Sequence, residues 1–369
     1  MLAGLGHEIF VIKTNAEINK ELNTVYDFKK LNVQVENISI PTNVSQLIKA
    51  IVVNPVSFLK AFSFDFKQFK KEFAASLSKI VLNKIDPDIV HFEFSGIGVK
   101  FLPLLKNLKA KKIVSCRGTS EKVKLLTDVQ RQKDIKILFE NVDAIHCVSS
   151  DMQRTIVPYC SNNQKVFVNR PAIDAEFFLP PANKTDNSVT QILSIGRFTF
   201  QKGYLIGLLA IKELVNKNIE IEWKIAGDGP QKEELLFHIH ELGLKNHVQL
   251  LGNKNKNEIN TLLDTSDIFM LTSFYEGIPN VILEAMSKEL PVVTTRCGGV
   301  EEVIDNGTDG FIAELYDHHQ VADYMSQLIS NKALQINMGK AARMKIVKHF
   351  TLQHQATIFE EHYKNLLSK

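Results

Sequence analysis

Residues 268–286 read IFMLTSFYEGIPNVILEAM and predict one unit of a parallel α/β sheet. The four apolar residues 268–271 have the length and composition of a short buried strand. Pro279 is a residue that starts helices, so we expect a helix to begin at Pro279 or Asn280 and to run to Lys288. The first amides of such a helix have no acceptor within the helix and can hold a phosphate.

Two carboxylates flank this predicted helix start. Glu276 precedes the helix, and Glu284 lies a little over one turn inside it. A carboxylate beside a helix start can simply stabilise the helix dipole, and a glutamate within a helix is usually solvated. Together, however, the two side chains can accept hydrogen bonds from different hydroxyl groups of one elongated ligand. We therefore treat Glu276 and Glu284 as candidate binding residues.

The alternation of short apolar runs with helix-length segments extends in both directions along the chain. The runs are residues 8–13, 33–40, 88–92, 112–116, 144–148, 166–168, 191–195, 219–226, 248–251, 268–271, 291–294 and 310–312. This pattern predicts parallel sheets covered by helices on both faces. Because 369 residues exceed what one hydrophobic core usually supports, we expect two doubly wound domains.

The boundary between these domains is expected in the proline-containing and polar segment Pro171–Ser188. We accordingly predict an N-terminal domain of residues 1–172 and a C-terminal domain of residues 187–350. A last helix is expected at residues 352–367, with Thr351 as its cap.

Two further loops follow predicted strands of the second half, where ligands bind in open parallel sheets. After residues 191–195 come Gly196 and Arg197, and Lys202 completes a loop with two cations suited to a diphosphate. After residues 219–226 comes the Gly-Asp-Gly-Pro turn that begins at Gly227. Each loop alone is weak evidence, since the second is also an ordinary turn sequence.

Composition limits the remaining classes of function. No apolar run reaches the roughly 18 residues of a membrane span. The four cysteines are scattered and form no C-x-x-C pair, which disfavours disulfides or a zinc site. A reduced cytosolic compartment therefore fits best. Residues 1–185 hold 26 basic against 18 acidic residues, whereas the remainder holds 18 against 23. The basic half suggests an anionic membrane surface or a phosphate-bearing acceptor, or lysines that only keep the surface soluble. Nucleic acid is disfavoured because no basic motif is interleaved with aromatic residues.

These elements resemble, in their order, the retaining glycosyltransferases of the large group 1 or family 4 type, which includes many bacterial polysaccharide enzymes. The motifs are G-R-x4-K-G at 196–203, G-D-G-P at 227–230, Glu-x7-Glu at 276–284 and the loop 298–302. The resemblance runs from about Ala3 to the end and is strongest over 191–312. It implies the GT-B fold, with two Rossmann-like domains facing a central cleft and the final helix, about 351–369, packed back on the first.

The resemblance also implies roles for individual residues. Arg197 and Lys202 would contact the donor diphosphate, Glu276 the hydroxyls of the transferred sugar, and Glu284 the ribose. Further donor contacts would come from Gly196, Gly227, Asn253, Gly277, Ile278, Pro279, Asn280 and Val281. The donor would be a nucleotide diphosphate-sugar, UDP- or GDP-linked, with no other cofactor and no metal, because the only D-x-D spelling, at 86–88, precedes a predicted strand.

The first half departs from the family pattern at two places. Arg117 stands where many relatives have histidine. Its charge could stabilise the leaving phosphate, so Arg117 is a catalytic candidate, or its side chain could pair with a neighbouring carboxylate. His91 could meet the acceptor or be buried. The segment from Leu2 resembles the family's first helix end and second strand, so we expect either that the protein begins before Met1 or that the N-terminal domain lacks its first strand.

The function implied by the resemblance is transfer of a sugar to a glycan or lipid-linked acceptor with retention of configuration. Exopolysaccharide or lipopolysaccharide biosynthesis is the specific expectation, in the cytoplasm or at the inner face of the membrane, with peripheral contact to anionic lipid. Two alternatives stay open. One is a donor-binding, catalytically impaired GT-B remnant, and the other is a GT-B sugar-nucleotide epimerase.

Overall fold

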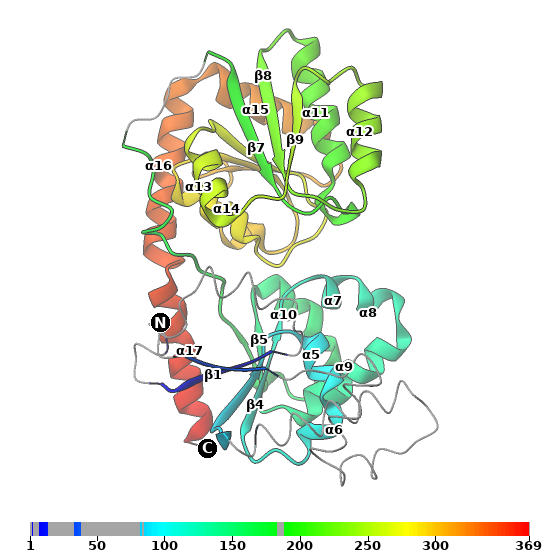
Figure 1. Ribbon diagram of the computed structural model, residues 1–369, viewed down its shortest axis with the longest axis vertical. Coiled ribbons are helices and arrows are strands. Elements are labelled where there is room, and N and C mark those ends of the chain that lie inside the picture. The colour runs from blue at the N-terminus through cyan, green and yellow to red at the C-terminus, as the bar shows by residue number, and fades with distance from the viewer. Residues whose placement is uncertain are drawn as a thin grey trace.

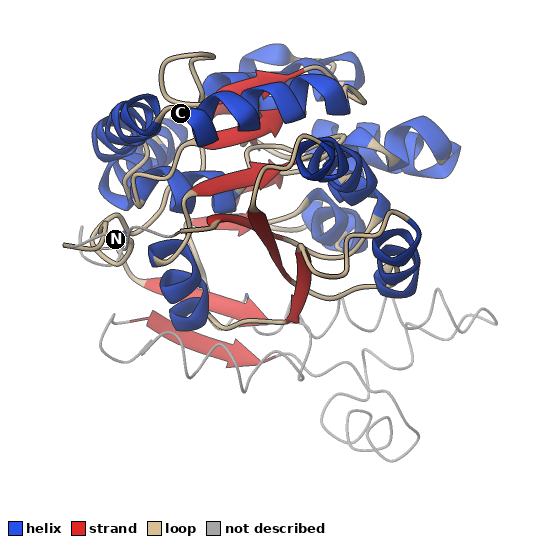
Figure 2. Ribbon diagram, turned by 90° about the horizontal axis from the view of Figure 1, so that it is seen from above, coloured by secondary structure: helices blue, strands red, loops and turns tan. Residues whose placement is uncertain are grey.

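The computed structural model describes residues 2, 7–13, 33–37, 82, 85–182 and 188–368 of the chain. Two α/β parts, each built on parallel strands and flanked by helices, lie one above the other along the long axis (Figure 1). The view from above shows helices on both sides of the strands (Figure 2). The two-domain α/β prediction is therefore confirmed. The predicted strand end at 38–40, part of the predicted boundary (183–187) and part of the basic half, including residues 41–81, fall outside the described residues.

The N-terminal part contains two separate parallel sheets. Among the described residues β1 (Ile9–Lys13) pairs with β2 (Val33–Asn37), whereas β3 (Ile89–Phe92), β4 (Lys111–Cys116), β5 (Ala144–Cys147) and β6 (Val166–Val168) follow one another in a second sheet. The helices are α5 (Ser95–Lys100), α6 (Leu102–Leu105), α7 (Thr119–Lys122), α8 (Lys124–Thr127), α9 (Val129–Asn141) and α10 (Ser150–Ile156). Within the described residues no backbone pairing joins β1 or β2 to β3, and the expected missing strand stays a prediction.

The C-terminal part holds a six-stranded parallel sheet in the order β12-β11-β10-β7-β8-β9. Its strands are β7 (Thr190–Ile195), β8 (Ile221–Ala226), β9 (Val248–Gly252), β10 (Ile268–Leu271), β11 (Val292–Thr295) and β12 (Phe311–Ala313). The connecting helices are α11 (Tyr204–Asn216), α12 (Lys232–Glu241), α13 (Lys256–Asp264), α14 (Asn280–Ser287), α15 (His318–Ser330) and α16 (Lys332–His349). The strand ends, and the start of α14, lie within a few residues of their predicted positions.

The core of this part lies on both faces of the sheet, as buried strands of mostly apolar residues require. Helices α11, α12 and α15 cover one face, and α14 and α16 cover the other. Trp223 of β8 is fully buried beneath α11, and a Cβ on Gly207 would come within 2.7 Å of its ring, so the glycine makes room for the indole. Losing a buried tryptophan side chain typically costs about 3–5 kcal/mol.

The last helix, α17 (Leu352–Leu367), joins the two parts (Figure 1). Thr351 caps it by accepting a hydrogen bond from the His354 amide, as the sequence predicts. Phe359 of α17 is buried in one cluster with Ile113 of β4 and Phe167 of β6. The chain therefore ends packed against the first sheet, although α16 before it packs on the second.

Candidate active site

The loops that carry the predicted motifs meet because their strands are neighbours in the sheet. β10 pairs directly with β7, with Ile268 opposite Ile192, so the loops that follow both strands leave the same edge side by side. The first loop carries Lys202 and the second carries Glu276. In the structure the Lys202 ammonium lies 2.7 Å from Oε1 of Glu276. The two residues therefore form an ion pair, which the sequence analysis did not anticipate.

Glu276 is held by two further side chains that were not predicted. The Ser273 hydroxyl donates to Oε1 at 2.9 Å, and the Gln201 amide donates to Oε2 at 3.1 Å. The same amide of Gln201 also donates to the Tyr275 carbonyl at 2.9 Å. With 9% of the residue exposed, the carboxylate of Glu276 is oriented on both oxygens before any ligand enters.

Arg197 differs from Lys202 in its surroundings. It is exposed, and no ion pair to its guanidinium occurs among the described residues. Gly196 and Gly227 are constrained instead by how closely their turns approach each other. The Gly196 amide donates to the Ala226 carbonyl at 2.9 Å, and a Cβ on Gly227, whose φ is 150°, would lie 2.0 Å from the Gly196 carbonyl oxygen. Both glycines thus keep the cationic loop against the neighbouring turn.

The helix that follows Glu276 in the sequence has no side-chain cap at its start. α14 begins at Asn280, as predicted, with Pro279 as its cap and no side-chain hydrogen bond at that end. The first amides, of Asn280 and Val281, therefore have no intrahelical acceptor and can hold an anion. Asn280 is exposed, whereas the Ile278 side chain is buried in the core, so only the backbone of Ile278 could face a ligand.

Glu284 lies half-buried on α14, and its carboxyl group accepts no hydrogen bond from the described residues. Burial raises its pKa to about 7, although the nearby Lys256 ammonium opposes the shift. Lys256 also lies over the Phe177 ring, 4.0 Å from its centroid. A carboxyl group with free acceptor atoms in such a place suits the hydroxyls of a ligand. Asn253, one residue past β9, is exposed.

The N-terminal domain brings Arg117 to the same region. Its guanidinium pairs with the Glu93 carboxylate and lies 5.6 Å from the centroid of the Phe94 ring. Of the two alternatives for Arg117, pairing with a carboxylate is the one present here. The Arg117 carbonyl oxygen would lie 2.7 Å from a Cβ on Gly277, so this glycine permits direct contact between the domains.

His91 does not face the candidate site. Its ring bonds to the Tyr363 and Ser115 hydroxyls, each at 2.8 Å, beneath α17. Burial and, to a lesser extent, the Arg117 charge lower the His91 pKa to about 3. His91 as a residue is half-buried, and its low pKa keeps the ring neutral at physiological pH.

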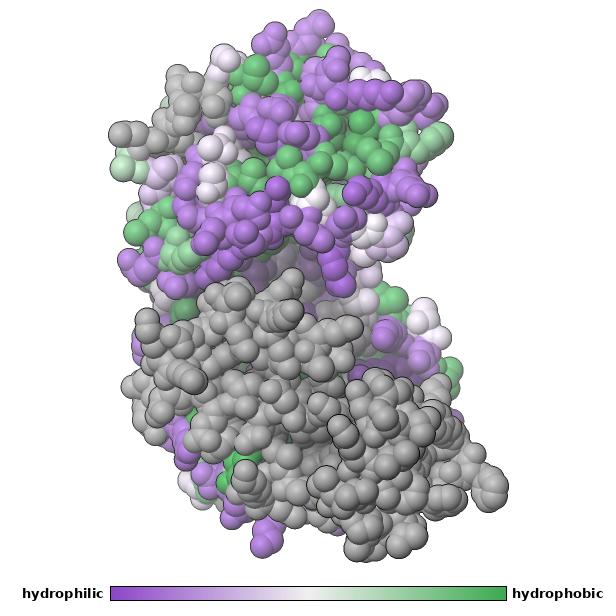
Figure 3. Space-filling model, in the orientation of Figure 1, coloured by the Kyte–Doolittle hydropathy of each residue, from purple (hydrophilic) through white to green (hydrophobic). Residues whose placement is uncertain are grey.

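Hydrogen bonds and an ion pair join the domains at the candidate site, and the sequence analysis did not predict these contacts. The Thr119 hydroxyl donates to the Gln201 side-chain carbonyl at 3.3 Å, so Gln201 connects α7 to Glu276. The Glu302 carboxylate accepts from the Asp151 amide at 3.1 Å and pairs with Arg170 at 2.8 Å. The surface narrows at this level, where a notch separates the two domains (Figure 3). The motif Gly298–Glu302 identified this loop in the sequence, but it did not predict that Glu302 connects the two domains.

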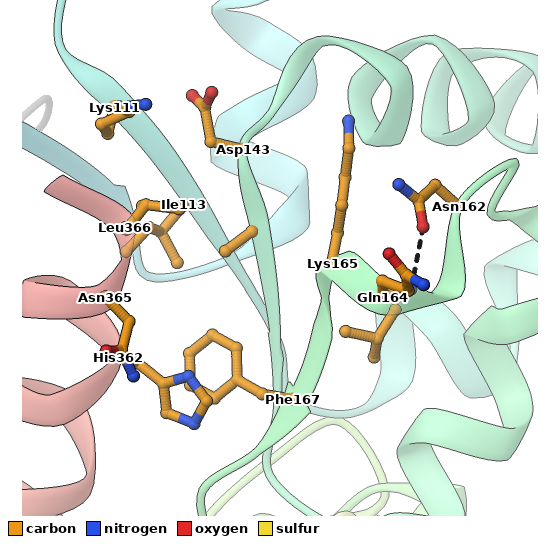
Figure 4. A pocket seen from close by; sticks show the side chains of 12 residues that line it. Lys111, Ile113, Asp143, Asn162, Gln164, Lys165, Phe167, His362, Asn365 and Leu366 are labelled. Atoms are coloured by element: carbon orange, nitrogen blue, oxygen red, sulfur yellow. Dashed lines mark hydrogen bonds between the residues drawn. The ribbon is translucent and has the colours of Figure 1, made fainter. Parts of the chain in front are cut away.

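A distinct pocket of about 340 Å³ lies elsewhere, where β4, β5 and β6 begin and α17 passes (Figure 4). Its walls include Lys111, Asp143 and Lys165, and the Phe167 ring stacks on the His362 imidazole at 3.9 Å. Arg117 follows the opposite end of β4, so this pocket is separate from the candidate site. None of the predicted site residues lines it.

Two features of the described residues bear on metals and membranes. Asp86 and Asp88 belong to no group of three possible metal ligands in the described part of the chain. In that same part, every helix is too short or too polar to cross a membrane.

Comparison with known proteins places this arrangement in a class. The structure of Anabaena Alr3699/HepE in complex with UDP and glucose superposes with a TM-score of 0.76, covering 97% of this chain and 99% of that one at 15% identity. The fold is therefore that of the GT-B glycosyltransferases. Residues 177–345, just under half of the chain, match the family described as glycosyl transferases group 1.

Two curated relatives agree with this assignment. The amylovoran biosynthesis glycosyltransferase AmsK of Erwinia amylovora is 29% identical over 293 residues, 78% of this chain and 69% of that protein. The UDP-Gal:alpha-D-GlcNAc-diphosphoundecaprenol alpha-1,3-galactosyltransferase of Escherichia coli is 28% identical over 259 residues, 64% of this chain and 66% of that protein. The matched parts span about two thirds of these relatives.

Proposed function

We propose that this glycosyltransferase moves a sugar from a nucleotide diphosphate-sugar to a glycan or lipid-linked acceptor in polysaccharide biosynthesis. The observation that carries the proposal is the convergence of Lys202, Glu276 and the open start of α14 on one place. A cation and unpaired amides suit a diphosphate, and a fixed carboxylate suits sugar hydroxyls. Glu284, with free acceptor atoms, suits the ribose.

The chemistry follows from where negative charge develops. As the bond between the sugar and the diphosphate breaks, charge accumulates on the leaving phosphate, and Lys202, Arg197 and the α14 amides can stabilise it there. The acceptor hydroxyl would lose its proton to that phosphate on the same face of the sugar, so that configuration is retained. No side-chain nucleophile and no metal ion are required in this scheme. Arg117 would join the phosphate only after leaving Glu93.

The relatives' names favour particular substrates. AmsK is named for amylovoran biosynthesis, and the galactosyltransferase is named for a UDP-galactose donor and a diphosphoundecaprenol-linked acceptor. A UDP-sugar and a lipid diphosphate-linked glycan are therefore the substrates we propose to test first. The basic N-terminal half would then hold the enzyme at the inner, anionic face of the membrane in the cytoplasm.

Two alternative functions make different predictions. A remnant would bind the nucleotide without transfer, and Arg117 at the usual histidine position favours it. An epimerase would convert the donor without any acceptor. The Glu-x7-Glu motif of Glu276 and Glu284, together with Arg197 and Lys202, favours transfer over epimerisation.

The test has two parts. Thermal unfolding is measured with UDP, GDP, ADP and CMP, for the wild-type chain and for Glu284→Ala. A ligand at about 100 times its dissociation constant stabilises the folded state by roughly 2.7 kcal/mol, enough for a visible shift. One nucleotide should shift wild type and not the variant. The matching radiolabelled UDP- or GDP-sugars are then offered with an undecaprenyl diphosphate-linked glycan.

The outcomes separate the candidates. Label in the lipid fraction supports transfer. Nucleotide binding with no product from any acceptor supports the remnant, and an altered sugar on the nucleotide without acceptor supports the epimerase. A cooperatively melting protein that no nucleotide shifts would remove the donor site altogether.

A further inference from the structure

Outside the candidate active site, three side chains of types that bind metal ions converge on the surface of the C-terminal domain. Glu213 lies near the end of α11, and His318 and His319 form the first turn of α15. Their ligand atoms, one from each residue, all lie within 4.8 Å of one another. This is the one such group of three in the part of the chain that the structure describes.

One of the spacings already matches that around a single ion. His318 Nε2 lies 3.3 Å from Glu213 Oε1, and His319 Nδ1 contacts the same oxygen. Zinc bonds to nitrogen and oxygen measure about 2.0–2.2 Å, so two ligands of a tetrahedral ion lie roughly 3.3–3.6 Å apart. The imidazole centroids are 4.1 Å apart, and the planes of the rings meet at 33°. Small side-chain rotations would place all three ligands around one centre.

A second observation concerns Glu213 itself. Its Oε1 atom is screened from solvent and accepts no hydrogen bond with acceptable geometry from the described residues, despite the two adjacent imidazole nitrogens. A buried carboxylate oxygen without such a bond is costly, and a bound cation removes that cost. The rest of the site is open, since 27% of the His318 and 73% of the His319 side chain are exposed.

We propose that Glu213, His318 and His319 bind one divalent transition-metal ion, best Zn²⁺, with water completing the coordination. Two neutral imidazoles and one carboxylate form a donor set that zinc accepts, whereas magnesium and calcium prefer oxygen ligands. The ion would tie α11 to α15. Because α11 begins at Tyr204, two residues after Lys202, the metal would stabilise the helix that supports the cationic loop.

The test uses the full chain without a histidine tag, stripped with EDTA and dialysed. Isothermal titration with ZnCl2 should give one site per chain, and the melting temperature should rise with Zn²⁺ but not with Mg²⁺. The variants His318→Ala and Glu213→Gln should weaken Zn²⁺ binding at least tenfold. Co²⁺ should show the visible absorption bands of a tetrahedral site, which the variants lose.

The matched control is His240→Ala, which removes an exposed histidine that pairs with only one carboxylate, Glu241. It should leave the Zn²⁺ affinity unchanged. Circular dichroism first establishes that each variant is folded. If His318→Ala does not fold, the test rests on Glu213→Gln, which preserves the shape of the side chain. No Zn²⁺ binding by the wild-type chain would overturn the proposal, as would equal binding by both site variants, because the three residues would then form only an ion-paired cluster.

Discussion

Lys202 and Glu276 form an ion pair 2.7 Å long between two loops that are 74 residues apart in the sequence. Only 13% of the Lys202 side chain and 11% of the Glu276 side chain are exposed, so each charge relies on the other for much of its stabilisation. A diphosphate that enters the site would compete with Glu276 for the Lys202 ammonium. The pair therefore links the stability of the C-terminal domain to the binding of the donor.

A double-mutant cycle measures this coupling. Lys202→Met and Glu276→Gln should each destabilise the domain by about 2–3 kcal/mol, because each leaves a poorly solvated charge without its partner. The double variant should be less destabilised than the sum of the two. Fluorescence of Trp223, the single tryptophan and fully buried in this domain, reports the unfolding in urea. Additivity within about 0.5 kcal/mol would mean that the contact contributes nothing.

Lys202→Ala tests whether the ammonium also meets phosphate. Loss of a charge-assisted hydrogen bond should weaken UDP binding by about 10- to 100-fold and leave uridine binding nearly unchanged. Titration calorimetry with both ligands gives the two ratios. Lys217→Ala, which removes the same charge from a surface pair with Asp323, is the control. Equal losses for UDP and uridine would show that Lys202 does not contact the diphosphate.

Glu276→Ala separates catalysis from nucleotide binding. Because Glu276 is proposed to contact the transferred sugar, the variant should lose transfer and keep nucleotide affinity within a few-fold. Transfer of label and calorimetry with the nucleotide alone measure the two effects. Turnover equal to that of the wild-type chain would contradict the assignment of Glu276.

Glu284 should make the stability depend on pH. Burial raises its pKa from 4.5 to about 7, so the folded protein keeps a proton that the unfolded chain loses near pH 4.5. The contribution of Glu284 to stability is therefore greatest below pH 4.5 and is lost as the pH rises through 7, by on the order of 3 kcal/mol at most. Urea unfolding from pH 5 to 8.5 should show a decline in wild type that Glu284→Gln lacks. Parallel curves for the two proteins would exclude a raised pKa.

Gly277→Ala should separate the domains. The new Cβ would lie 2.7 Å from both the Arg117 carbonyl oxygen and a Val148 methyl group, on the opposite side of the cleft. Because the domains must move apart to relieve that overlap, the free energy of unfolding should fall by about 1–3 kcal/mol. The radius of gyration in solution scattering should increase. Gly96→Ala is the matched control, since its Cβ would meet nothing within 4 Å. An unchanged scattering curve for Gly277→Ala would show that this contact does not hold the domains together.

Much of the fold could be predicted from local patterns. Short apolar runs gave the strands, Pro279 marked the start of α14 to within a residue, and Thr351 marked the cap of α17. These signals are local, since a buried parallel strand needs a continuous apolar run and a helix start needs particular residues at one or two positions. The order of the motifs along the chain likewise pointed to the family.

The candidate site was predictable only in part. Its charged and glycine residues stood out in the sequence, but Gln201 and Ser273 did not, because a glutamine or serine in a loop has no pattern of its own. Their importance depends on the distance to Glu276, which follows from the pairing of β7 with β10. The bridging role of Glu302 similarly depends on how the two domains meet.

The sequence by itself determined the alternating α/β architecture, the strand and helix positions and the set of side chains available for binding a nucleotide-sugar, because each follows from residue type and short spacing. Only the tertiary structure decided which of those side chains face one another. It joined Lys202 to Glu276, paired Arg117 with Glu93, and placed His91 in a hydrogen bond with Tyr363, 272 residues away. Such contacts arise from long-range packing, in which distant segments exclude water together, and no local pattern records them.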